Sequence, residues 1–577
     1  MTNESIRLVK VERVDDLPVL FGVLRQVGIA ELLDEFFPTH HNWHDGLSFG
    51  QVVEGWMIYI LSQGDHRLNK VEAFVEQHLS VYEASFGRPV RALDFSDDRL
   101  ADVLERLARE PGWGEFESAL NQKTLRVYDL GVERVRLDST TTYSYQAVSE
   151  EGLLQLGFSK DRRPDLGQVK ISLASLDPLG MPLMTAVLSG QSADEPLYVP
   201  AIKRVQESVG HGGKLYVGDA KMGTLATRAW LASSRDFYLC PLSGSQMAQT
   251  LFEALVEPAL VGEVSLEEVF QPAASTEEAK ELLGVGYRTR RRLRSAVAGR
   301  AIEWEESLYV VRSESYARSE KERLEKRLLR AGAEIEKLNE RRQGKKRLSE
   351  IELKEAAQAV LRKHHCGELL EVSVEVKESR KAVRKYQARV AEERIEREIK
   401  ISVERDEQAI KRKKQYSGWR VYGSNKKDLE LSAAVLSYRE QYQIEHSISR
   451  LKGRRLGMQP LYLQKEERIT GLIHLLTLCV RELTLLEFVV RRELANQDEQ
   501  LKGIYSSQRG RQTRRPSAEL ILEAFCGISV TTVEVAGKQK RLLSELNEVQ
   551  QRLLMLLNLP KSVYESLSCD FINPVPL

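Results

Sequence analysis

Apolar residues recur every three to four positions through the N-terminal part of the chain. Stretches of this kind begin near Leu17, Gln51 and Leu100, and Ser96 stands where it can cap the last of them. Such spacing places apolar side chains on one side of a helix. The pattern predicts an N-terminal helical domain over residues 1–125.

After residue 130 the period changes to two, which is typical of half-buried strands. Five strands are predicted, with helices between the last three, at about 132–137, 169–176, 182–190, 215–218 and 237–241. The fourth strand can lie beside the first and parallel to it. The residues that end these two strands would then meet at one edge of the sheet.

Residues 245–415 interrupt this order with a mixed α+β segment. One helix is predicted from a heptad-like seam, and Gly344 can turn it back toward a second helix at about 349–363. The seam consists of Leu324, Leu328, Ala331, Ile335 and Leu338. Two alternating stretches that follow predict strands, so the segment combines a helical hairpin with strands.

A further strand near residue 419 and a helix over about 431–453 resume the earlier pattern. The chain is therefore expected to have an α/β core that is split by an insertion and flanked by helical regions. The predicted parts are 1–125 (helical), 126–244 (first part of the core), 245–415 (insertion), 416–495 (second part of the core) and 496–577 (helical).

Composition narrows the class of protein. A chain of 577 residues is too long for one hydrophobic core. The net charge of +1 does not by itself indicate a nucleic-acid-binding protein. Any surface that binds nucleic acid must therefore come from local clusters of basic residues. Five scattered cysteines without a CxxC pair favour a reduced, cytoplasmic location. The most apolar run, 471–490, contains four ionisable residues, so we expect a buried helix and no membrane contact.

Two aspartates end predicted strands. Asp138 closes one alternating stretch and precedes a run of hydroxyl residues, while Asp219 follows Gly218, which permits close backbone approach. A lone aspartate at a strand end is commonly a turn or capping residue. Two of them at the ends of strands that can be neighbours are much less expected by chance, which favours a shared function.

A glutamate on the predicted 431–453 helix completes a candidate site. Glu445 shares one helical stripe with Tyr438, Gln441, Ile448 and Lys452. A purely structural stripe would be aliphatic, so this mixture indicates a surface that faces a groove. Three carboxylates can hold two divalent cations about 3.5–4 Å apart for phosphoryl transfer, with waters and substrate oxygens completing the shells. We therefore expect the site to be incompletely organised without metal and DNA.

With these residues in this order, the chain resembles DDE transposases of the IS4 superfamily, closest to the IS1634-type insertion-sequence group. The most specific part is Tyr438-x2-Gln441-x3-Glu445-x6-Lys452, which matches the signature Y-(2)-R-(3)-E-(6)-K except at Gln441. The resemblance covers most of the chain. It implies a ribonuclease-H-like core and two Mg²⁺ ions, replaceable by Mn²⁺, held by Asp138, Asp219 and Glu445.

The resemblance also implies an endonuclease that cuts double-stranded DNA at element ends and joins it to target DNA. Tyr438 and Lys452 inherit contacts with the DNA backbone, and Arg439 or Arg450 could replace the guanidinium missing at Gln441. The family leads us to expect a homodimer on the DNA ends. It also implies a cytoplasmic protein associated with the bacterial nucleoid. The N-terminal domain would bind DNA ends or dimerise.

Two basic runs are further candidates for phosphate contact, since clustered arginines commonly pair with phosphates. They contain Arg290, Arg291 and Arg292 in the insertion, and Arg511 and Arg514 in the tail. The alternative is that both are solvated loops. Trp304 is expected to pack, with stacking on an unpaired base as the alternative.

Two other functions fit the same residues. One is a metal-dependent nuclease that does not transfer strands, and the other is a catalytically inactive relative that binds DNA. Gln441 is the motif-level hint for the inactive relative, whereas the three intact acids argue against it.

Overall fold

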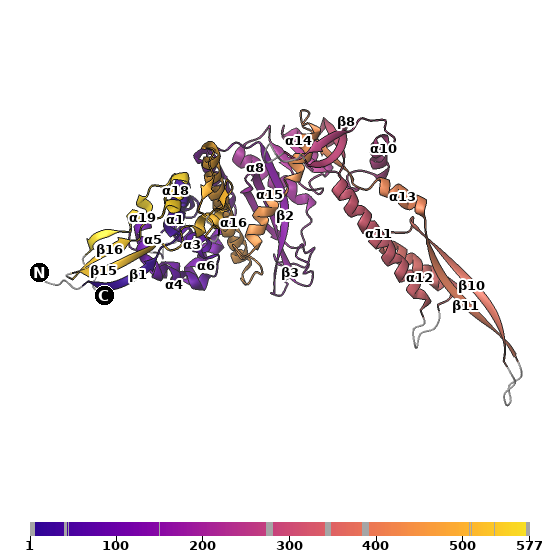
Figure 1. Cartoon of the computed structure of the whole chain (residues 1–577), viewed down its shortest axis with the longest axis horizontal. Helices are drawn as coiled ribbons and strands as arrows, with labels where there is room; N and C mark the ends of the chain where they lie inside the picture. The colour runs from indigo at the N-terminus through magenta and orange to yellow at the C-terminus, as the bar shows by residue number, and fades with distance from the viewer. Residues whose placement is uncertain are drawn as a thin grey trace. The chain divides into compact units, whose positions relative to one another are not determined.

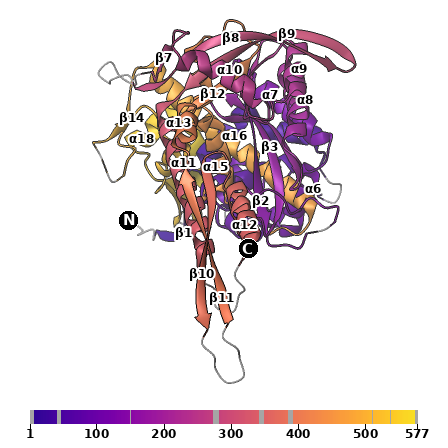
Figure 2. The same cartoon turned by 90° about the vertical axis from the view of Figure 1, so that its right-hand side faces the viewer.

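The computed structural model describes residues 6–39, 43, 46–148, 150–272, 281–340, 348–383, 392–506, 508, 510–535 and 537–572. The chain forms two compact units, shown in Figures 1 and 2. Unit 1 comprises Met1–Cys240, Arg294–Trp304 and Ser437–Leu577. Unit 2 comprises Pro241–Leu293 and Glu305–Leu436.

The predicted N-terminal helices are present in unit 1. They are α1 (Leu17–Val27), α2 (Ile29–Phe36), α3 (Phe49–Gln63), α4 (Leu68–Gln77), α5 (Leu79–Phe86), η1 (Ala92–Phe95), α6 (Asp97–Leu107) and α7 (Gly112–Val127). A capping box between Ser48 and Gln51 begins α3. A Cβ at Gly50 would lie 1.9 Å from the Ala30 carbonyl oxygen, so glycine permits α2 and α3 to pack closely.

A four-stranded sheet joins the two ends of the described chain, which corrects the prediction of wholly helical terminal regions. Its order is β1 (Arg7–Arg13), β15 (Ser529–Val535), β16 (Lys538–Leu543) and β17 (Cys569–Ile572), and β1 pairs antiparallel with β15. The C-terminal region also contains the helices α17 (Ala518–Glu523), α18 (Glu548–Leu556) and α19 (Ser562–Glu565), and the short pair β13 (Leu501–Lys502) and β14 (Gln512–Thr513).

The central strands of unit 1 follow the predicted order. They lie in the sequence β4 (Met181–Ser189), β3 (Gly167–Asp177), β2 (Arg134–Ser144), β5 (Leu215–Val217) and β6 (Phe237–Pro241), with η2 (Glu195–Leu197), α8 (Tyr198–Val209) and α9 (Leu225–Ser233) between strands. β5 is parallel to β2, as predicted, and pairs Val217 with Arg136. β2 continues to Ser144, so Asp138 lies inside this strand and not at its end.

The predicted 431–453 helix is broken in two, which corrects the expectation of one continuous element. α14 (Leu431–Arg439) ends before α15 (Tyr442–Lys452) begins. α16 (Glu466–Asn496) follows and is buried along most of its length, as expected for the apolar run. Its Gly471 approaches α6 closely, because a Cβ there would lie 2.0 Å from the Leu104 carbonyl oxygen. No helix within the described ranges is long and apolar enough to cross a membrane.

Unit 2 contains the predicted helical hairpin and strands. Its elements are α10 (Gln249–Leu260), β7 (Glu267–Phe270), β8 (Leu282–Val297), β9 (Arg300–Arg312), α11 (Glu314–Glu336), η3 (Lys337–Asn339), α12 (Glu350–Lys363), β10 (Leu370–Val383), β11 (Glu392–Arg405), α13 (Glu407–Gln415) and β12 (Trp419–Ser424). The tip of the β8–β9 hairpin, Arg294–Trp304, groups with unit 1. Figures 1 and 2 show β10 and β11 as a long paired ribbon.

The seam of α11 is buried within the chain, which confirms the intrachain hairpin. Leu324, Leu328, Ala331 and Ile335 pack in one apolar cluster with residues of α12 and with Ile401 of β11. Leu338 is partly buried against the same cluster. The predicted turn at Gly344 lies outside the described residues.

Candidate active site

The register of β2 and β5 brings two of the predicted acids together. Arg136 pairs with Val217 in parallel register, and Asp138 and Asp219 each stand two residues further along. They therefore lie at the same level on neighbouring strands. Their carboxylates interact, since the charge of Asp219 helps to raise the pKa of Asp138.

The carboxylate of Asp138 is largely buried and already faces one cation. Burial raises the pKa of Asp138 above its ordinary value, and the Lys160 ammonium and the Ser139 backbone N–H oppose that rise. Oδ1 accepts from the Ser139 N–H at 2.8 Å and from Lys160 Nζ at 3.3 Å. The side chain is 16% exposed, so solvent still reaches it.

Asp219 is held by three donors on a single oxygen. Its Oδ1 accepts from the Tyr198 hydroxyl at 2.6 Å, from the Lys221 N–H at 2.8 Å and from the Met222 N–H at 3.3 Å. Burial and the neighbouring Asp219 carboxylate raise the pKa of Tyr198 well above its ordinary range, so its hydroxyl stays protonated as a donor.

The second oxygens of both aspartates suit a cation. In the described part of the chain, no hydrogen bond reaches Oδ2 of Asp138 or of Asp219. Hard carboxylate oxygens are the ligands that Mg²⁺ prefers. Asp138 already forms an ion pair with the Lys160 ammonium, so its carboxylate is accessible to a positive charge. The residues present therefore fit a divalent ion at this place.

Glu445 stands apart from this pair. It is exposed on α15, and among the residues that the structure describes no three His, Cys, Asp or Glu side chains are grouped to hold a metal ion. The structure brings Asp138 and Asp219 together and leaves Glu445 on the adjacent helix.

Helix α15 is fastened to β2 at both ends, and Figure 1 draws the two beside each other. Just before the helix, Glu440 forms ion pairs with Arg134 at 2.7 Å and with Arg136 at 3.3 Å. At its last residue, Lys452 Nζ donates to the Thr141 carbonyl oxygen at 2.8 Å and to Asp161 at 2.5 Å. The helix therefore runs along the strand that carries Asp138.

The break at residues 440–441 corrects the predicted stripe. Tyr438 belongs to α14 and is half-buried, whereas Gln441 is the N-cap of α15. The side-chain oxygen of Gln441 is buried and has no hydrogen-bond partner in the described part of the chain. Only Glu445, Ile448 and Lys452 share α15 itself.

The arginines proposed to replace a guanidinium at position 441 differ in access. Arg439 is exposed at the end of α14. Arg450 is buried and forms ion pairs with Glu487 and, at 3.4 Å, with Glu519. The charge of Arg450 is therefore used inside unit 1 in this structure, and a contact of Arg450 with DNA stays a prediction.

The basic run of the insertion lies on strand β8 and not in a solvated loop. Arg290 pairs with Glu305 at 3.3 Å and Arg291 with Glu306 at 2.6 Å, so acids of β9 neutralise both. Arg292 is exposed.

The remaining candidates from the tail and from the hairpin tip also have local partners. Arg511 lies 4.3 Å from the ring centroid of Tyr505, and Arg514 pairs with Asp498 at 2.9 Å. Trp304 donates its indole N–H to the Tyr238 hydroxyl at 2.8 Å, which agrees with the packing interpretation.

Sequence reasoning missed four polar residues around the acids. They are Lys160, Asp161, Asp194 and Tyr198. Asp194 accepts from the Ser139 hydroxyl at 3.1 Å and pairs with Lys170 at 2.7 Å. Lys160 and Asp161 lie in an irregular segment. Lys160 contacts Asp138 of β2 and Asp161 contacts the distant Lys452, so no local period signals them.

Comparison with known proteins now adds to this geometry. The family model described as a transposase DDE domain matches residues 165–481, and one described as a domain of unknown function (DUF4277) matches residues 9–112. The first match includes Asp219 and Glu445 and begins after Asp138.

Among solved structures, the cryo-EM structure of a piggyBac transposase synaptic complex with hairpin DNA is similar at a TM-score of 0.34 and 8% sequence identity. The similarity covers 85% of this chain and 79% of that chain, and a score this low assigns no fold. No curated protein matches the chain.

Proposed function

Because the chain belongs to the transposase DDE-domain family, whose model spans more than half of its 577 residues, we propose that it cleaves DNA at the ends of an insertion sequence and transfers the cut strands into target DNA. Asp138, Asp219 and Glu445 are the proposed catalytic acids and metal ligands. A ribonuclease-H-like core and membership of the IS4 superfamily, in the IS1634-type group, belong to the same proposal.

One observation carries the choice of acids: α15 is anchored along β2. Glu445 precedes the Lys452 anchor by seven helical residues, about 10 Å of rise. Asp138 precedes the Thr141 anchor by three strand residues, also about 10 Å. Glu445 therefore lies on the part of α15 between these contacts, beside the strand that carries Asp138, which supports it as the third acid.

The protein's own residues have separate tasks in this mechanism. When bound, two divalent ions supply activation of the attacking oxygen, from water or a DNA 3′-hydroxyl, and stabilisation of the leaving oxygen. Asp219 is oriented by Tyr198 and two backbone N–H groups, so its free oxygen is directed without rearrangement. Asp138 must be ionised to act as a ligand, which the Lys160 ammonium favours.

Lysines around the acids provide contacts for phosphate. Lys452 is half-buried against β2 and pairs with Asp161, so a DNA phosphate would compete with that carboxylate for the ammonium. Tyr438 and Arg439 are the proposed further backbone contacts. The expected partner is double-stranded DNA, bound by a homodimer at two element ends, in the bacterial cytoplasm near the nucleoid.

A single assay tests the proposal. Purified protein is incubated with Mg²⁺, a donor plasmid carrying its own element's ends and a target plasmid. Joined products are expected, whereas nicks alone would favour the nuclease and binding without cleavage would favour an inactive relative.

Asp138→Asn should lower cleavage by at least about 100-fold, the scale of losing one preorganised charged group, while end binding persists. The matched control is Asp165→Asn, since Asp165 is exposed and pairs with the neighbouring Arg163 at 2.8 Å. Cleavage that survived Asp138→Asn would refute the site assignment.

A further inference from the structure

Unit 2 carries a group of cations that the proposed catalytic site does not use. Three adjoining hollows lie over α11, α12 and α13, and Arg327 lines all of them. Six of the lysine and arginine side chains around these hollows have no ion-pair partner among the described residues. We call this set the α11 basic face: Arg323, Lys326, Arg327, Arg330, Arg362 and Lys413.

Four of these cations form one stripe on α11. Lys326, Arg327 and Arg330 lie three, four and seven residues after Arg323, so the four share one side of the helix. Like charges at this spacing destabilise a helix. A run of such neighbours is unfavourable unless anions from outside the chain offset it.

Three acids of α11 have partners outside the stripe, and Glu322, one turn before Lys326, forms no ion pair among the described residues. Glu320 accepts the Gly418 N–H at 2.8 Å. Glu334 pairs with Lys363 at 2.8 Å and with His364 at 2.7 Å. Glu325, on the opposite side of α11, pairs with Lys414 at 2.6 Å. These three acids therefore do not neutralise the stripe.

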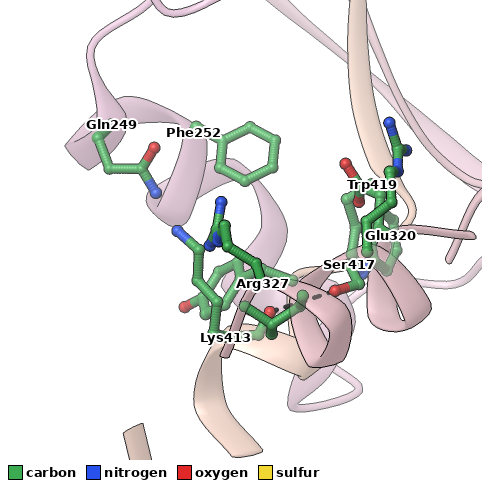
Figure 3. A pocket seen from close by; sticks show the side chains of 10 residues that line it. Gln249, Phe252, Glu320, Arg327, Lys413, Ser417 and Trp419 are labelled. Atoms are coloured by element: carbon green, nitrogen blue, oxygen red, sulfur yellow. Dashed lines mark hydrogen bonds between the residues drawn. The ribbon is translucent and has the colours of Figure 1, made fainter. Parts of the chain in front are cut away.

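Arg327 is shared by all three hollows, and one of its guanidinium nitrogens lacks an acceptor among the described residues. Its Nε is buried and makes no hydrogen bond within the described ranges. A buried guanidinium N–H without a partner is costly, so an acceptor from a ligand would stabilise it. Figure 3 shows Arg327 and Lys413 beside one another in one of these hollows, a cavity of about 490 Å³ that Gln249 and Phe252 of α10 also line.

The length of the stripe distinguishes a polymer from a small anion. From Arg323 to Arg330 the helix rises about 10 Å. One strand of duplex DNA carries a phosphate per about 3.4 Å of axis, so the stripe spans about three phosphates. Four exposed or half-buried cations over that length exceed what a single phosphate group can contact.

From this geometry we infer that the α11 basic face is a second DNA-binding surface, which grips the phosphodiester backbone of duplex DNA without reading its sequence. The inference extends the proposed function, because such a surface would hold DNA that the catalytic acids cleave. It assigns a role to the helical hairpin of the insertion.

The test uses the full-length protein and a random-sequence duplex, with affinity measured over a range of salt concentrations. The variant combines Arg323→Gln, Lys326→Gln, Arg327→Gln and Arg330→Gln. The matched control removes the same charge from exposed cations of unit 2 outside the stripe, with Arg318→Gln, Lys354→Gln, Lys377→Gln and Lys400→Gln. Thermal unfolding of both variants tests whether they are folded.

The stripe variant is expected to bind about 10-fold more weakly or worse, and its plot of log affinity against log salt should be shallower by about 3, because each phosphate contact contributes about 0.9. The control should keep the wild-type slope. An unchanged slope in the stripe variant would overturn the inference. So would competition by inorganic phosphate as effective, per phosphate, as that of the duplex, since it would identify a small-anion site.

Cleavage of the donor plasmid by the wild-type protein is followed in parallel. If the wild-type protein cleaves DNA and the stripe variant keeps the wild-type salt slope, the basic face does not bind DNA, whereas the proposed function is supported. If the stripe variant has a reduced salt slope but the wild-type protein does not cleave DNA, the basic face binds DNA and the proposed function is wrong.

Discussion

The ammonium of Lys160 lies where it would repel a metal ion at Asp138, so removing it should tighten metal binding. Its Nζ is 3.3 Å from Asp138 Oδ1, and Mg²⁺ sits about 2.1 Å from a carboxylate oxygen, so the ammonium and an ion on the same carboxylate would be roughly 5–6 Å apart. Lys160 is 37% exposed, so the dielectric constant of water is the appropriate one. Repulsion between charges of +2 and +1 is then about 1.5 kcal/mol, roughly a 10-fold change in affinity.

The predicted outcome is that Lys160→Met binds Mn²⁺ up to about 10-fold more tightly than the wild type, measured by isothermal titration calorimetry. Lys160→Arg keeps the charge and should leave the affinity close to that of the wild type. The variant Asp138→Asn lacks the proposed metal ligand and serves as the reference. Adding Lys160→Met to this variant should not change its affinity for Mn²⁺. Unchanged or weaker Mn²⁺ binding by Lys160→Met would refute the reasoning, because the ammonium and the ion would then not share Asp138.

Two further predictions concern stability. Gly471→Ala should destabilise unit 1 by about 1–3 kcal/mol, because the added Cβ would meet the Leu104 carbonyl oxygen of α6. Gly332→Ala on α11, where the nearest atom is 3.8 Å away, should stabilise the protein by about 0.5–1 kcal/mol. Chemical denaturation measures both changes in unfolding free energy, and two changes of the same sign would contradict the prediction. Burial raises the pKa of Glu482 to about 7 from 4.5, and neither carboxylate oxygen has a hydrogen-bond partner in the described part of the chain. The native state therefore binds the extra proton, so stability falls as pH rises from about 4.5 to about 7 and stays reduced above that. Glu482→Gln should remove this part of the fall, and a difference in melting temperature between variant and wild type that did not grow over this range would contradict it.

The parts of the fold that the sequence predicted are those with a regular local period. The strand order around Asp138 and Asp219 followed from alternation and the parallel crossover rule, and the observed register agrees with it. The helical seam from Leu324 to Ile335 was likewise visible, because its apolar spacing matches the cluster that it buries. In both cases neighbours in sequence carried the information.

The parts that were missed depend on partners distant in sequence. β1 is an edge strand with mostly exposed residues, and its pairing partner β15 lies more than five hundred residues away. β2 was expected to end at Asp138 because hydroxyl residues follow, yet Thr140, Thr141 and Thr142 are buried within it. A run of hydroxyl residues is typical of a loop in the sequence. Here it forms a strand because β2 pairs with β3 along its whole length.

The break before α15 has the largest consequence for the site. The 3.6-residue period continues across residues 440–441, so the pattern could not reveal it, while the ion pairs of Glu440 with Arg134 and Arg136 fix the chain there. With Lys452 fixed at the other end, α15 is held along β2 and Glu445 lies exposed between two anchors. An acid carried in this way is held beside the strand while its side chain stays exposed to solvent. That combination suits a third ligand that joins Asp138 and Asp219 only when cations offset the charge of three acids.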